Sequence, residues 1–144
     1  MRGDNEQSVR RLIQDSVNGN RPDLLDDFVD RDVRVHPGTP GAAPDTEGID
    51  ELQDAFRRFH QVFPDLHIAL DDVVAVDDKV AARWTASGTH RAELGGIPAT
   101  GSFVRWGGID FYRLVDGKVV EWWRNDDFVG LLQQLGRDLL TPSK

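Results

Sequence analysis

The sequence predicts an α+β domain in which helices come first and an antiparallel sheet follows. Before residue 64, apolar residues recur mainly at helical spacing, whereas after residue 66 they alternate with polar residues as strands do. Short turn sequences, Asp77-Asp78 and Asp116-Gly117, separate the later segments, which favours hairpins. Helices followed by a meander of strands pack on one face of a curved sheet.

Three helices are expected in the N-terminal half. The first carries apolar residues at helical spacing as far as Val17 and ends at Asn18-Gly19-Asn20. The second is short and opens at Pro22, where a missing N–H costs nothing. The third covers residues 49–63, has a strongly aromatic inner face, and ends before Pro64.

The expected strands begin with a short one. Val33 and Val35 alternate with charged residues up to His36. The stretch from Pro37 to Gly48 is rich in Gly, Pro and Ala and predicts a loop, which is either a surface excursion or a lid. Four longer strands are then expected at residues 66–76, 80–90, 102–114 and 118–124.

Composition limits the possible functions of what we expect to be one domain spanning residues 1–144. The absence of cysteine excludes disulfides, thiolate catalysis and cysteine-ligated zinc. A net charge of −8 argues against nucleic acid and anionic membranes as partners. No apolar run approaches the ~20 residues of a membrane span. The polar N-terminal residues show no signal peptide, so a cytoplasmic location is expected.

The turn of the last hairpin decides which charged side chains are neighbours, because a one-residue shift moves every side chain to the other face. A two-residue turn would leave Asp110 and Arg124 on opposite faces. A three-residue loop with Gly117 in the left-handed conformation would pair Leu114 with Lys118 and put the two charges on one face. We favour the second register because the remaining charges then form a solvated or interfacial face.

In that register the two faces of the hairpin differ in character. One face carries the expected pocket residues Asp110, Tyr112, Trp122 and Arg124, and the other carries Phe111, Arg113, Glu121 and Trp123. The neighbouring strand presents Trp84 and His90 on one side, with small residues between and around them. Those small residues indicate either a cavity wall or close packing of a helix on the sheet. Ionisable groups among tryptophans are costly to bury, which points to an apolar pocket with a few polar groups.

Several motifs resemble the SnoaL-like polyketide cyclases of the nuclear-transport-factor-2-like superfamily. They are Phe63-Pro64-Asp65-Leu66-His67, Gly88-Thr89-His90, the turn from Pro98 to Gly101, Arg113…Asp116-Gly117-Lys118-Val119…Glu121…Trp123 and Asp127…Gly130…Gln134-Leu135-Gly136. With the early helices, the resemblance covers nearly the whole chain. It implies a conical α+β barrel around a deep pocket, a homodimer or homotetramer, and a cofactor-free enzyme that closes a polyketide ring by intramolecular aldol condensation.

One departure from the family bears on the chemistry. The cyclases' catalytic Asp aligns with Arg124, and their supporting His aligns with Asp110. The resemblance therefore implies either that Asp110 acts as the base beside Arg124, or that aldol chemistry is absent. Asp110, Arg124 and Asp127 also resemble in kind the Asp-Arg-Asp set of limonene-type epoxide hydrolases, although the spacing differs.

Each candidate residue has a structural alternative. Asp110 is expected to be functional because an unpaired buried carboxylate is costly. Arg124 is either its catalytic partner or only a buried counter-ion, and Asp127 is either catalytic or the N-cap of the following helix. His90 could donate to a substrate carbonyl, and His36 lies at the pocket rim or on plain surface. We expect His60 and His67 to be structural. The aromatic candidates Trp84, Tyr112 and Trp122 form a pocket wall or core.

The best overall interpretation is a cofactor-independent acid/base enzyme acting on a polyketide-like small molecule. The histidines show no metal-ligand spacing, so no metal is expected. The alternatives are epoxide hydrolysis or epoxide opening, and a non-catalytic binding or dimerisation module. An aromatic pair, Phe111 and Trp123, on an otherwise charged sheet face predicts a homodimer built partly on that face.

Overall fold

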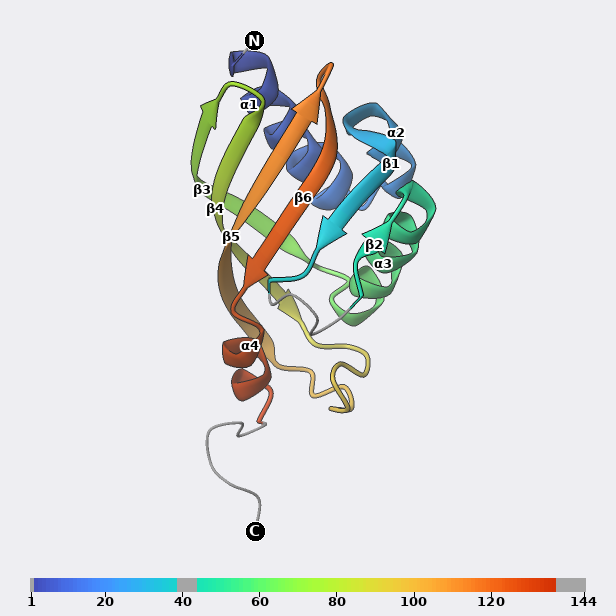
Figure 1. Cartoon of the computed structure of the whole chain (residues 1–144). Coiled ribbons are helices and arrows are strands. Elements are labelled where there is room, and N and C mark those ends of the chain that lie inside the picture. Colours follow the sequence, from blue (N-terminus) through green and yellow to red (C-terminus); the bar gives the residue numbers. More distant parts are fainter. Residues whose placement is uncertain (1, 39–43, 137–144) are drawn as a thin grey trace.

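The computed structural model describes residues 2–38 and 44–136 (Figure 1). Helix α1 (Arg2–Arg11) continues directly into a π-helical segment, η1 (Leu12–Val17). The other helices are a single 3₁₀ turn η2 (Pro22–Leu24), α2 (Leu25–Phe28), α3 (Ile49–Val62) and α4 (Phe128–Gln134). In the described part of the chain, none is long and apolar enough to cross a membrane.

Six strands form one sheet in the order β2-β1-β6-β5-β4-β3. Their bounds are β1 (Val29–His36), β2 (Thr46–Glu47), β3 (His67–Val76), β4 (Lys79–Thr89), β5 (Phe103–Val115) and β6 (Lys118–Asp126). The pairs β1–β2, β3–β4, β4–β5 and β5–β6 are antiparallel, but β1 lies parallel to β6. The expected α+β fold is confirmed, and the sheet is mixed rather than wholly antiparallel because β1 and β6 run in the same direction.

The sheet stays open, and helices cover its concave side (Figure 1). Helix α1 packs against β3 and β4, and α3 packs against β1. Side chains alternate along β5 as expected for a sheet with one covered face: Val104, Trp106, Asp110, Tyr112 and Leu114 are buried. The π-helical η1 and α3 lie opposite this inner face, so the core and the site form between the two layers.

The expected loop between β1 and α3 contains a short strand. Thr46 and Glu47 pair antiparallel with Val35 and Arg34, which extends the sheet beyond β1. Two residues carry no readable alternation, so the sequence pattern could not reveal β2. Residues 39–43 of this segment lie outside the described residues.

The turn of the last hairpin differs from the expected one. Asp116 and Gly117 both have positive φ, 51° and 78°, and Val115 pairs with Lys118. This is the two-residue turn whose twist matches that of the strands, so the predicted three-residue loop is wrong.

The predicted grouping of side chains is nevertheless correct, for another reason. The register shifts between Leu114, which pairs with Val119, and Arg113, which pairs with Glu121. Val120 is therefore an extra residue on β6, and this bulge restores the face that the tight turn would have reversed. Beyond it, Asp110 lies directly opposite Arg124.

Candidate active site

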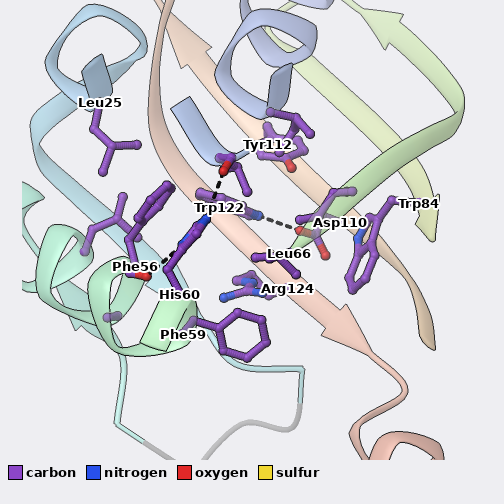
Figure 2. A pocket seen from close by; sticks show the side chains of 15 residues that line it. Leu25, Phe56, Phe59, His60, Leu66, Trp84, Asp110, Tyr112, Trp122 and Arg124 are labelled. Carbon is purple, nitrogen blue, oxygen red and sulfur yellow. Dashed lines mark hydrogen bonds between the residues drawn. The ribbon is translucent and has the colours of Figure 1, made fainter. Parts of the chain in front are cut away.

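A cavity of about 180 Å³ lies between the helices and the inner face of the sheet (Figure 2). Most of its wall is aliphatic or aromatic and comes from η1, α2, α3 and strands β3 to β6. The residues that line it are Ile13, Val17, Leu25, Leu52, Ala55, Phe56, Phe59, His60, Leu66, Ile68, Trp84, Asp110, Tyr112, Trp122 and Arg124. Five of the predicted site residues therefore meet at this cavity.

Asp110 is the carboxylate in the cavity wall. It is only 3% exposed. Its Oδ2 accepts a hydrogen bond from the indole N–H of Trp122 at 2.9 Å, and its Oδ1 accepts a longer one from the backbone N–H of Asn125 at 3.3 Å. Within the described residues it forms no ion pair. Two hydrogen bonds orient a buried carboxylate that keeps accepting capacity for a ligand.

Tyr112 places a phenol beside this carboxylate. The residue is fully buried and its ring packs at 5.0 Å from that of Trp122. Its hydroxyl has no hydrogen-bond partner among the described residues. Burial, reinforced by the negative charge of Asp110, raises the pKa of the phenol well above its ordinary value. Tyr112 therefore stays protonated and offers an unused O–H donor.

Trp84 supplies a second unused donor, because its buried indole N–H also lacks a partner in the described structure. The ring has room because Gly108 lies opposite it on β5. A Cβ at Gly108 would approach the Trp84 ring to 2.6 Å and the backbone of β6 to 2.8 Å. Gly108 thus leaves room for the indole against the sheet. Gly88 has a different role, since its missing side chain makes room for Phe63 at the end of α3.

Arg124 borders the cavity without a carboxylate partner. Although it faces Asp110 in the strand register, its guanidinium lies over the Trp122 ring, 5.6 Å from the ring centroid. No ion pair or side-chain hydrogen bond of Arg124 exists within the described residues, and its buried Nε is unsatisfied. The structure therefore does not support the interpretation of Arg124 as a simple counter-ion of Asp110 or Asp127.

His36 lies outside the main cavity, on the outer face of the sheet. Its ring nitrogens are 3.0 Å from Asp45 and 2.6 Å from Glu121, and its ring stacks on Trp123 at 5.4 Å. The bond to His36, followed by those to Arg113, lowers the pKa of Glu121. His36 also lines two outer hollows that share Arg124 with the main cavity. It is a rim residue with its bonding capacity filled.

His90 does not line the cavity, contrary to our expectation. The ring is completely buried at the end of β4, where Phe63 lies beside it. Its Nδ1 accepts from the backbone N–H of Thr100 at 3.1 Å, and its Nε2 has no partner in the described structure. Phe63, which was expected on the aromatic inner face of the third helix, instead packs over β4 at Gly88 and against the histidine, which stays outside the cavity.

Asp127 also lies away from the cavity. It is exposed and its Oδ1 accepts from the backbone N–H of Gly130 at 2.9 Å, which makes it the N-cap of α4. Of the two interpretations left open by the sequence, capping is the one that the hydrogen bonds support.

Several lining residues were missed because they lie on helices rather than strands. Phe56, Phe59 and His60 all come from the aromatic face of α3, a face that the sequence did indicate. His60 remains structural in its bonding, since its two ring nitrogens contact the backbone carbonyls of Phe56 and Val17. The described residues contain no cluster of three or more acidic or histidine side chains that could hold a metal ion.

Comparisons with known proteins agree with this architecture. Residues 7–135 match the family model of the SnoaL-like polyketide cyclases. The chain is 27% identical over 135 residues to the aklanonic acid methyl ester cyclase DnrD of Streptomyces peucetius, covering 93% of this chain and 92% of that protein.

Solved structures give the same result. TsrD from Streptomyces laurentii superposes with a TM-score of 0.82 at 32% identity, covering 94% of this chain and 97% of that one. A SnoaL-like protein from Jannaschia sp. CCS1 shares the fold with a TM-score of 0.86 at 19% identity, over 95% and 94% of the two chains. The protein therefore belongs to the SnoaL-like polyketide cyclase family.

Proposed function

We propose that this protein catalyses an intramolecular aldol cyclisation of a polyketide-like small molecule, with Asp110 as the general base. The observation that carries the proposal is the set of polar groups that surround Asp110 in the cavity. Among the described residues, a buried carboxylate without an ion pair borders the same apolar cavity as three donor atoms without a partner, on Trp84, Tyr112 and Arg124. Family membership and the curated relative, a cyclase by name, support the same reaction class.

The proposed step needs one base and one or more hydrogen-bond donors. Asp110 removes a proton from a carbon between two carbonyl groups, and the resulting enolate carbon attacks a ketone in the same molecule. A C–C bond forms while the attacked C=O becomes an alkoxide, which takes the proton back and becomes a tertiary alcohol. Tyr112 O–H and Trp84 N–H are the donors that stabilise the developing oxyanion, and Arg124 adds positive charge.

The cavity contributes by restricting the substrate. An open-chain polyketide has many rotatable bonds, and holding the two reacting carbons together removes an entropic cost that can reach several kcal/mol. The stacked rings of Tyr112 and Trp122 and the aromatic face of α3 offer flat surfaces for this purpose. His36 lies at the rim with both ring nitrogens already bonded, so it can offer only a ring contact to the part of the substrate that extends outward.

The test is Asp110→Asn. Asparagine keeps an oxygen for the Trp122 indole but cannot accept a proton, so turnover should fall by ~10²–10⁴-fold while the fold is retained. Asp127→Asn is the matched control, because asparagine also caps helices and this carboxylate lies outside the cavity. Full activity of Asp110→Asn in a cyclisation assay would reject the assignment of the base.

The other hypotheses predict different results. Epoxide hydrolysis by an Asp-Arg-Asp set would require Asp127, and the control variant would then lose activity too. A binding module would bind aromatic ligands with equal affinity in the wild type and the Asp110→Asn variant and would turn over none of them. The capping role of Asp127 gives the epoxide hypothesis less support than the aldol one.

A further inference from the structure

We infer that Arg124 is a binding site for a carboxylate group of the ligand, so that the substrate of this protein is a free acid. This inference rests on the proposed function for the identity of the pocket, but not on the chemical step. It begins from a charge that the protein itself leaves unused. Arg124 has five N–H donors, and no described residue accepts a hydrogen bond from its side chain.

The surroundings make this unused capacity unusual. The arginine on the opposite face of the same hairpin, Arg113, is occupied, since it holds Glu121 at 3.3 Å. Arg124 instead lies against the Trp122 ring, and its Nε is buried without a partner. A buried donor without an acceptor is costly, so an acceptor supplied by a ligand is the natural complement.

The position of Arg124 suits a ligand that is longer than the inner cavity. The residue borders the main cavity with Asp110 and also borders both outer hollows, one with Asn125 and the other with Phe128. A ligand whose rings occupy the inner cavity can therefore present a terminal group to the guanidinium as it leaves the mouth. Figure 2 shows Arg124 among the lining side chains, between Asp110 of the sheet and Phe59 of α3.

The charge distribution selects the kind of terminal group. Asp110 is the one carboxylate among the residues that line the inner cavity, and Arg124 is the one cation there. A ligand carboxylate beside Asp110 would be repelled, whereas beside Arg124 it would form two parallel N–H···O bonds with a planar fork. A methyl ester offers one weaker acceptor and no charge. The guanidinium of Arg124 would thus distinguish an acid from its ester.

The experiment uses anthraquinone-2-carboxylate and its methyl ester as a matched pair of probes, with binding followed by quenching of tryptophan fluorescence. We expect the wild type to bind the acid roughly 10-fold or more tightly than the ester, as hydrogen bonds to charged groups imply. Arg124→Gln should lose this preference while its affinity for the ester stays within about twofold. Arg124→Lys should keep part of the acid preference, since lysine retains the positive charge but lacks the two parallel N–H donors of the guanidinium.

Controls separate this inference from the proposed function. Arg83→Gln removes an exposed arginine of β4 and should leave the acid preference unchanged. Asp110→Asn should keep or strengthen the preference, whether or not it loses turnover, because it removes a neighbouring negative charge and binding requires no base. 2-Hydroxyanthraquinone should bind no more tightly than the methyl ester, since a single phenolic oxygen cannot form two parallel hydrogen bonds with the guanidinium.

Three outcomes would overturn the inference. They are equal affinity of the wild type for acid and ester, an acid preference that survives Arg124→Gln in a variant with unchanged thermal stability, and failure of the acid to bind the wild type. If the wild type also bound 2-hydroxyanthraquinone more tightly than the ester, to the same degree as the acid, Arg124 would not be selecting carboxylates.

Discussion

The two faces of the β5–β6 hairpin carry similar charged residues, which form ion pairs on one face and not on the other. On the inner face, Asp110 and Arg124 lie opposite each other without forming an ion pair. On the outer face, the next charged cross-strand pair, Arg113 and Glu121, is bonded at 3.3 Å, and His36 contacts the same carboxylate at 2.6 Å. The same strands thus hold one satisfied cluster and one unsatisfied pair.

This difference helps to separate structural from functional charges. The outer cluster spans three strands, and each of its members has a partner within the protein, as expected of groups that hold a surface together. The inner pair is directed to a cavity and is surrounded by donors that bind nothing in the described structure. Buried polar groups are nearly always paired, so exceptions that gather around one cavity indicate a ligand site.

The largest expected effect comes from destroying the arrangement that separates the faces. Inserting one residue between Glu121 and Trp122 would shift the register by one, moving Trp122 and Arg124 to the outer face and turning Trp123 inward. Such a chain should fail to fold, which circular dichroism and the soluble yield would reveal. Val120→Ala keeps the register and should fold; a cooperative, native-like insertion variant would contradict the importance given to the separation of the two faces.

Tyr112→Phe tests one of the unpaired polar groups of the inner face. The hydroxyl has no partner in the described structure, so its loss should not lower thermal stability. If the hydroxyl stabilises an oxyanion, turnover should fall by about 10²–10³-fold. Kinetics and thermal unfolding measured on one preparation test both parts. Full activity together with a marked loss of stability would make this hydroxyl structural.

Glu121→Gln tests the outer cluster through pH. The pKa of Glu121 is lowered in the folded protein, mainly by His36, relative to an ordinary value of 4.5. Its ion pairs therefore stabilise the fold above the unfolded pKa, and this stabilisation is lost as pH falls through the folded pKa. The variant should be less stable than the wild type near pH 6, and the difference should shrink on acidification below about pH 4.5. Urea unfolding at several pH values measures this difference in the free energy of unfolding. A difference that is independent of pH would count against the prediction.

The smallest effect on the folded monomer concerns the predicted homodimer. Val74, Ala81, Phe111 and Trp123 lie in one row across the outer face, and Phe111 is 40% exposed. We expect Phe111→Lys to weaken self-association in sedimentation experiments and to leave the monomer folded. Val129→Lys, an exposed position on α4, serves as the control. A wild type that is monomeric at micromolar concentration would refute the dimer.

Local pattern was sufficient for much of the fold and part of the site. The alternation of β5 identified Asp110 and Tyr112 as members of one face, and the spacing within α3 identified an aromatic face that does line the cavity. Both features depend on the side-chain periodicity of a single strand or helix, and this periodicity can be read from neighbouring residues.

Tertiary structure decided the rest, because those features depend on contacts between elements. The bulge at Val120 arises where the tight turn and the buried faces of two strands must be reconciled, and no single strand records it. Phe63 packs over the end of β4 and removes His90 from the cavity, although both residues fit a pocket by pattern. The sequence by itself thus determined which side chains share a face, while the packing of helices on the sheet determined which of them reach the cavity and which charges remain unpaired.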